Sequence, residues 1–182
     1  MSYSTQNSIL LNTLMKFYKK DNNIDKMLSI INGESKISLR IVDWFATNYA
    51  KKHYTILKTI DNKRFKVYDD YKLKLKAYSK KRFDPFCRWE RITIPYKNNS
   101  LIQTTIGQLN FFKWALENKV IDYIIENYNN IEKDMNTRNS TSKNKNSLKA
   151  ISNTTRKKRE ELSISASKTI KKEVVEIIVK FD

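Results

Sequence analysis

Cationic and aromatic side chains interleave most densely between Tyr71 and Tyr96, in the segment YKLKLKAYSKKRFDPFCRWERITIPY. Lysine and arginine neutralise phosphates and release counterions, and exposed aromatic rings stack on unpaired bases. The pattern therefore predicts a surface that binds nucleic acid. We expect phosphate contacts from Lys72, Lys74, Lys76, Lys80, Lys81, Arg82, Arg88 and Arg91, and stacking on bases from Tyr78 or Trp89 where either ring is exposed.

The same segment has a second interpretation. Tyr71, Phe83, Phe86 and Trp89 are also suitable core residues, and the lysines would then form a solvated face. No spacing typical of an RRM, a KH domain or a zinc knuckle accompanies the segment. The sequence leaves both interpretations open.

A second basic cluster lies near the C-terminus, at Arg156, Lys157, Lys158 and Arg159. Such a cluster is typical of a nuclear-localisation signal or of a mobile arm that contacts nucleic acid. It is equally consistent with a spacer before Glu160 and Glu161. We include its four cations among the predicted nucleic-acid contacts.

The sequence gives little support for a metal site, a nucleotide-binding motif or a catalytic site. The chain has one cysteine and one histidine, Cys87 and His53, so it lacks the cluster of histidines and cysteines that a zinc site needs. No P-loop, glycine-rich dinucleotide turn or nucleophile elbow occurs. Thr105 and Gln108 form a capping box, whose free N–H groups would more commonly cap a helix than receive a phosphate. We predict no enzyme, no catalytic residue, no cofactor and no metal.

Composition limits the remaining classes. The formal charge of +17 favours nucleic acid, an anionic membrane or an acidic protein as partner. Abundant Asn, Lys and Ile are also what AT-rich coding produces, which explains part of the lysine excess without selection for binding. The single cysteine excludes a disulfide within the chain and fits a reducing compartment. No apolar run approaches membrane-spanning length, and we expect an intracellular, soluble protein that is not secreted and does not bind membranes.

The predicted helices and strands indicate an α+β fold. We expect a small mixed domain with a short antiparallel sheet packed by helices. We divide the chain into an N-terminal helical extension (1–36), a compact core (37–135), a flexible basic linker (136–160) and a C-terminal helix and strand (161–182). An apolar fraction of 40% is enough for a hydrophobic core.

Within the core, periodicity predicts the following elements. They are a helix over 38–53 capped by Ser38, a hairpin pairing 54–57 with 65–68, a helix over 71–80 capped by Asp69 or Asp70, a strand over 88–94 ended by Pro95, a helix from Thr105 to about Asn118 and a helix over 120–128. The segment at 71–80 also alternates like a strand, and its good helix formers favour the helix.

The C-terminal segment VVEIIVKF, residues 174–181, predicts a strand after a short helix over 162–172. An unpaired strand edge promotes aggregation, so we expect this strand to pair with the core sheet or with a second copy, which would make a homo-oligomer.

A resemblance to a known family rests on the phrases SLRIVDWFATNYAKKH, YKLKLKAYSKKRFDPFCRWERI, TTIGQLNFFKWALENKVIDYI and RKKREELSISASKTI. Together they resemble a family of small basic proteins of the nucleocytoplasmic large DNA viruses, from mimivirus and phycodnavirus relatives. The resemblance spans about Ile37 to Met135 and the segment from Arg156. It carries over no catalytic or binding residue, and it implies a protein of the viral factory in the host cytoplasm, or of the virion.

These observations predict a nucleic-acid-binding protein without strong sequence specificity, in viral genome packaging, replication or late transcription. DNA is expected before RNA. The alternative is a structural or scaffold protein of the virion, whose basic face binds an acidic viral protein and whose C-terminal strand completes a partner's sheet.

Overall fold

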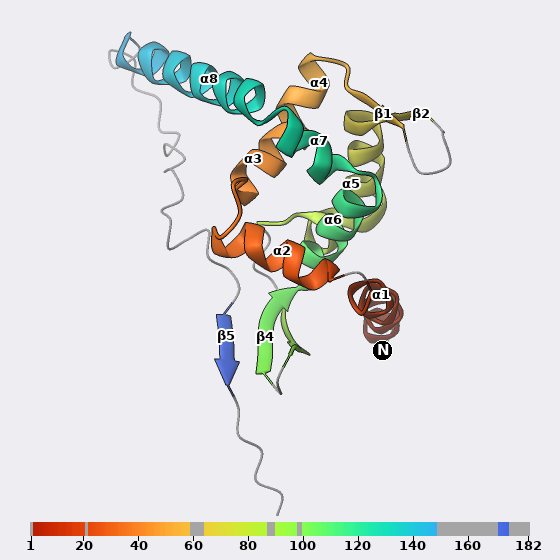
Figure 1. The fold of residues 1–182 in the computed structure, drawn as a ribbon. Coiled ribbons are helices and arrows are strands. Elements are labelled where there is room, and N and C mark those ends of the chain that lie inside the picture. Colours follow the sequence, from red (N-terminus) through yellow and green to blue (C-terminus); the bar gives the residue numbers. More distant parts are fainter. Residues whose placement is uncertain are drawn as a thin grey trace, which may run out of the picture.

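The computed structural model describes residues 2–20, 22–58, 64–86, 90–97, 100–148 and 171–174, with backbone alone at 2–5, 139–148 and 171–174. Helices dominate these ranges, and two small antiparallel sheets accompany them (Figure 1), so the predicted α+β class is confirmed. The helices are α1 (Ser2–Tyr18), α2 (Asn23–Asn32), α3 (Leu39–Trp44), the π-helical turn η1 (Phe45–Tyr49), α4 (Ala50–Lys52), α5 (Val67–Phe83), α6 (Ile106–Glu117), α7 (Val120–Glu126) and α8 (Tyr128–Leu148). The strands are β1 (Ile56–Lys58), β2 (Arg64–Lys66), β3 (Arg91–Pro95), β4 (Ser100–Thr105) and β5 (Lys171–Val174).

Helix α6 lies at the centre of the fold and is buried on nearly every side. The Thr105 hydroxyl caps its start by accepting a hydrogen bond from the Gln108 backbone N–H at 3.1 Å, as the sequence predicts. Phe111 and Trp114 of α6 are core residues. Their rings contact Tyr71 and Phe83 of α5, which makes an aromatic cluster between the two helices.

The N-terminal helices, predicted as a helical extension over 1–36, pack into the core. Leu14 of α1 and Met27 of α2 are fully buried. The Tyr18 hydroxyl donates a 2.6 Å hydrogen bond to the carbonyl oxygen of Leu109 on α6, and burial raises the pKa of that hydroxyl well above its usual value. The apolar side chains of both helices are removed from water only by packing on the rest of the chain.

The segment from α3 to α4 forms the predicted continuous helical stretch, with the Ser38 hydroxyl accepting from the Ile41 N–H at 3.4 Å. Its predicted apolar stripe is buried, including Phe45 and Ala46 at 0% exposure. The π-helical turn η1 was not predicted, because periodicity cannot detect one wider turn inside a helix.

The predicted hairpin is confirmed with shorter strands: β1 pairs antiparallel with β2, which leads directly into α5. The hairpin is followed by a helix and not by a strand, also as predicted. The predicted cap is wrong, because α5 begins at Val67 and Asp69 and Asp70 lie inside its first turn. There their carboxylates face the positive end of the helix dipole, and Asp70 accepts a 2.7 Å hydrogen bond from the Trp114 indole.

The second sheet has the strand order β3–β4–β5, all antiparallel. Pro95, predicted to end a strand beginning at Arg88, is the last residue of β3, where an edge strand tolerates a missing N–H. Strand β5 pairs Ser100 with Val174, so a C-terminal strand does return to the sheet. It begins at Lys171, within the segment predicted as a helix, and residues 175–182 of the predicted strand lie outside the described part of the chain.

Helix α8 contradicts the first part of the predicted linker over 136–160, because the helix continues through Leu148. Its first turns are anchored by the buried Ile131 and Met135, and by Asp134, which accepts from the Trp44 indole at 3.2 Å. A helix that is nucleated by packing extends at low cost through residues that bury nothing, which composition alone does not reveal. Residues 149–160 lie outside the described part.

Candidate nucleic-acid interface

The lysines of α5 do not share one face of the helix. Successive helical residues turn by about 100°, so Lys72 and Lys76 point the same way while Lys74 lies nearly opposite. Lys72 and Lys76 are exposed, and Lys74 is partly covered. In a strand, the alternating lysines would lie on one face; in the helix, they lie on different faces.

The other cations of the segment that were predicted to contact phosphates lie in different surroundings. Lys80 and Lys81 are exposed and follow a break in α5 at Ser79. The Arg82 guanidinium turns to α1, where Nε donates to Asn7 Oδ1 at 2.9 Å. Arg91 on β3 donates to Gln103 Oε1 on β4 at 2.9 Å. The described cations of the segment therefore point in several directions and have different partners.

Its aromatic residues follow the core interpretation where they are described. Tyr71 is 6% exposed and Phe83 is fully buried. Tyr78 is half-buried, with its ring stacked on Phe83 at a centroid distance of 6.1 Å. Arg88 and Trp89 lie outside the described part of the chain, as do Cys87 and the predicted cluster Arg156, Lys157, Lys158 and Arg159.

The β1–β2 hairpin presents a more compact group of cations. Its pairing register sets Lys58 directly opposite Arg64, and Lys66 opposite Ile56, and all four side chains are exposed. The other face of the hairpin carries Leu57 and Phe65, which pack toward the core. Opposed residues of an antiparallel pair have Cβ atoms about 5 Å apart, so two cations in that position destabilise the pairing unless an anion lies near them.

Tyr54 stands at the start of this hairpin and was missed by sequence reasoning, which placed it inside the strand. Its side chain is 87% exposed, and its backbone φ of 46° lies in the left-handed region that bulky residues rarely adopt. Thr55 fixes the position, because its N–H donates to the Ala50 carbonyl and its carbonyl accepts from Val67. The structure thus holds an aromatic ring in solvent beside the hairpin.

Helix α4 adds a further cation. Lys51 lies over the ring of Tyr68 on α5, with Nζ 5.5 Å from the centroid. We call the exposed group at this end of the molecule the hairpin surface (Figure 1). It consists of Lys51, Tyr54, Ile56, Lys58, Arg64 and Lys66.

Two neighbouring cations are engaged with carboxylates. Lys66 lies 3.9 Å from Asp69, an exposed pair of little energetic weight. Lys52 of α4 makes an ion pair with Asp134, whose side chain is only 10% exposed. Burial alone would raise the pKa of Asp134, but the hydrogen bonds from Lys52 and Trp44 outweigh it and hold that pKa below its usual value. We therefore leave Lys52 out of the hairpin surface.

Exposed lysines also lie elsewhere, for example Lys16, Lys19 and Lys20 near the end of α1. Positive charge alone does not distinguish the hairpin surface. Its distinguishing features are the opposed cations, fixed by strand register, and the exposed ring beside them. The alternation of Lys58, Arg64 and Lys66 with Leu57 and Phe65 was the sequence signal that could have revealed it.

Among the described residues, no group of three or more His, Cys, Asp or Glu side chains is placed to hold a metal ion. In the same ranges, no helix has both the length and the apolar composition needed to cross a membrane.

Comparison with known proteins relates this chain to a viral protein. Residues 2–179 match a family described as a family of unknown function, DUF7197. The chain is 44% identical over 145 residues to uncharacterized protein L507 of Acanthamoeba polyphaga mimivirus, an alignment that covers 75% of this chain. The chain spans about half the length of that relative, since the alignment covers 55% of it. No solved structure matches the fold. The resemblance to a family of large DNA viruses is confirmed.

Proposed function

We propose that this chain, which belongs to the family of unknown function DUF7197, binds nucleic acid through the hairpin surface without strong sequence specificity. The observation that supports this most is the register of the hairpin, which sets Lys58 opposite Arg64 on its exposed face. A phosphate between the two cations removes their repulsion and gains two charge-assisted hydrogen bonds.

Phosphate contacts of this kind carry no sequence information, because every nucleotide offers the same oxygens. Lys66 lies on the same exposed face of the hairpin. Lys51, Lys72 and Lys76 are further exposed cations on α4 and α5, the helices that precede and follow the hairpin. Tyr54 supplies a ring on which an unpaired base can stack, and every base has a face that stacks. Strands with unpaired bases are therefore the favoured substrates.

The relation to a viral protein indicates the processes in which the proposed binding would take place. In a large DNA virus, a basic protein of this type would act in genome packaging, replication or late transcription, in the cytoplasmic factory or in the virion.

The test is a binding titration of the full chain with a labelled duplex, single-stranded DNA and RNA of equal length, over a series of salt concentrations. Counterion release predicts a linear fall of log affinity with log salt, about 0.9 per phosphate contact for duplex and about 0.7 for single strands. The triple variant Lys58→Gln, Arg64→Gln, Lys66→Gln should lower the single-strand slope by about 2. The matched control Lys16→Gln, Lys19→Gln, Lys20→Gln removes the same charge from the last turn of α1 and the two residues after it, and should leave the slope nearly unchanged.

Equal losses in the two triple variants would mean that net charge alone drives binding, and the hairpin surface would then have no special role. Weak binding of all three nucleic acids near physiological salt would reject the proposal and favour the structural alternative, a virion scaffold that binds an acidic protein. In that alternative a partner's strand would add at the edge of β5 opposite to β4, since β5 is last in the strand order β3–β4–β5.

A further inference from the structure

The sequence typical of a strand continues beyond the point where β4 can pair with it. Strand β5 pairs with β4 as far as Val174, which lies opposite Ser100. Ser100 is the first residue of β4, and its N–H donates to the Lys97 carbonyl oxygen in the turn that follows β3. Strand β4 therefore has no residue left to pair with the segment that follows Val174, VEIIVKF (175–181).

This segment has the alternation of an amphipathic strand. Every second position is apolar and either β-branched or aromatic, namely Val175, Ile177, Val179 and Phe181. Between them stand Glu176, Ile178 and Lys180. Successive residues of a strand belong to opposite faces, so the four apolar residues would share one face. A strand of this composition without a partner promotes aggregation, and a pairing partner removes that hazard.

The segment is complementary to itself in one antiparallel register. Opposed residues of an antiparallel pair alternate between hydrogen-bonded and non-hydrogen-bonded pairs. A two-fold axis between two identical strands must therefore pass between one residue and its own copy. With the axis at Ile178, every opposed pair is either apolar or of opposite charge: Val175 with Phe181, Glu176 with Lys180, Ile177 with Val179, and Ile178 with its copy.

The neighbouring arrangements lack this match. With the axis one residue earlier, Glu176 lies opposite the apolar Ile178, and with the axis one residue later it lies opposite Asp182. In a parallel pair in register, Glu176 and Lys180 each lie opposite their own copies. Like charges directly opposite each other destabilise a strand pair, and opposite charges stabilise it. The two charges therefore favour the antiparallel register centred at Ile178.

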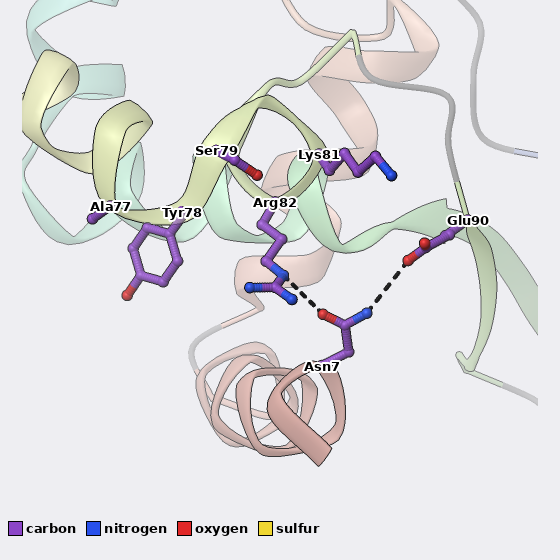
Figure 2. Close-up of a pocket in the computed structure, with 7 residues that line it drawn as sticks. All are labelled: Asn7, Ala77, Tyr78, Ser79, Lys81, Arg82 and Glu90. Atoms are coloured by element: carbon purple, nitrogen blue, oxygen red, sulfur yellow. Dashed lines mark hydrogen bonds between the residues drawn. The ribbon is translucent and has the colours of Figure 1, made fainter. Parts of the chain in front are cut away.

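The other edge of the same sheet is less suited to a second copy. Pro95 ends β3 and has no N–H to donate to an added strand. At the start of β3, Figure 2 shows Asn7 of α1 between Arg82 and Glu90. Asn7 accepts from Arg82 Nε at 2.9 Å and donates to the Glu90 carboxylate at 3.3 Å, which holds α1 against the residue before β3. A second copy is therefore better accommodated on the side of β5.

From these observations we propose that the chain forms a homodimer, in which the segments 175–181 of two copies pair antiparallel about a two-fold axis at Ile178. Residues 171–174 of each copy pair with its own β4, and the segment that follows pairs with the second copy. A two-fold contact closes on itself, so it gives a dimer and not a growing chain of copies. The inference goes beyond the proposed function and does not depend on it, since the hairpin surface and the segment have no residue in common.

The experiment is sedimentation velocity of the full chain without nucleic acid, over a series of protein concentrations. The formal charge of +17 on each copy opposes association, so the salt concentration is set to bring the Debye length below about 8 Å. We expect a monomer–dimer equilibrium with a dissociation constant in the micromolar range, because so short a pair of strands buries less than the roughly 1,200–2,000 Å² of a stable interface. Ile178→Lys places two cations opposite each other at the axis and should weaken the dimer at least about tenfold.

Exchanging the two charges tests the register itself. Glu176→Lys leaves only cations in the two charged pairs and Lys180→Glu leaves only carboxylates, so each should weaken the dimer about tenfold. The double variant Glu176→Lys, Lys180→Glu should recover the wild-type affinity. An equimolar mixture of the two single variants should form a heterodimer, because each copy then supplies the charges that the other lacks. The matched control Glu126→Lys makes the same change of net charge at an exposed position of α7 and should leave the dimer nearly unchanged.

Three results would overturn the inference: a chain that stays monomeric up to about 1 mM, a dimer that Glu176→Lys weakens no more than Glu126→Lys does, or single variants that fail to associate when they are mixed. The hairpin triple variant should form the dimer as the wild type does. Loss of nucleic-acid binding in that variant and loss of the dimer in Glu176→Lys are therefore separate results, and the failure of one proposal leaves the other standing.

Discussion

Replacing Gly107 with alanine tests how closely α6 and the end of α5 must approach. A Cβ atom at Gly107 would lie 2.8 Å from the carbonyl oxygen of Asp84 and 3.1 Å from that of Lys81. Both neighbours are backbone atoms, so no side chain can rotate to make room.

The expected loss of stability follows from two opposing effects. Overpacking a tight contact costs about 1–3 kcal/mol, and the upper end applies because two backbone segments must move apart. Alanine is the better helix former by about 1 kcal/mol, which offsets part of that cost. We expect Gly107→Ala to lower the free energy of unfolding by about 2 kcal/mol.

Urea denaturation followed by circular dichroism measures the change, and Gly33 provides the matched control. Gly33 ends α2 with φ 76° and has no atom within 4 Å of a built Cβ, so only its backbone conformation resists substitution. Gly33→Ala should cost about 1 kcal/mol, and Gly33→Asn should recover most of it, because asparagine tolerates the left-handed region. A Gly107→Ala protein as stable as wild type would refute the close approach of the two helices.

Two further predictions concern Tyr54 and Asp134. Tyr54→Ala should weaken the binding of single strands about fivefold or more and the binding of duplex much less, because only unpaired bases stack on the ring. The ring is 87% exposed, so its removal should cause no loss of thermal stability. Equal losses of affinity for both nucleic acids would exclude stacking. The pKa of Asp134 is lower in the folded than in the unfolded chain, so its ion pair stabilises the protein above about pH 4, and this contribution disappears as the pH falls through the folded-state pKa. Asp134→Asn should cost about 1 kcal/mol at pH 7 and reduce the loss of stability in acid, as measured by urea denaturation from pH 7 to pH 2; parallel pH profiles for the two proteins would contradict this.

Local signals predicted most of the helices and strands correctly. The Ser38 and Thr105 hydroxyls cap their helices as expected, because a cap depends on a few neighbouring residues. The β1–β2 hairpin was predictable from its β-branched and aromatic residues around a polar turn. The choice of helix for α5 was also correct, since Lys, Leu and Ala favour it wherever tertiary contacts allow.

The candidate sites could not be predicted in the same way, because they depend on geometry between distant segments. Lys72 and Lys74 are close in sequence and point to opposite sides of α5, while Lys58 and Arg64 face each other across a hairpin. The break at Ser79 has no glycine or proline to announce it. Helix α8 extends into a polar stretch because Asp134 and its buried neighbours anchor its start, an effect that composition does not contain.

The docking of α1 and α2 has a consequence for synthesis of the chain. Tyr18 bonds to Leu109, 91 residues later, and the Tyr96 hydroxyl donates to Asp25 across 71 residues, so the first two helices receive their partners only after α6 has been made. At about 5–20 residues per second, their apolar faces wait roughly 5–20 s on the ribosome without the surfaces that cover them. The helices that complete the core are therefore made before the surfaces that cover them, and nascent chains that stop before α6 should be preferred clients of the host's chaperones.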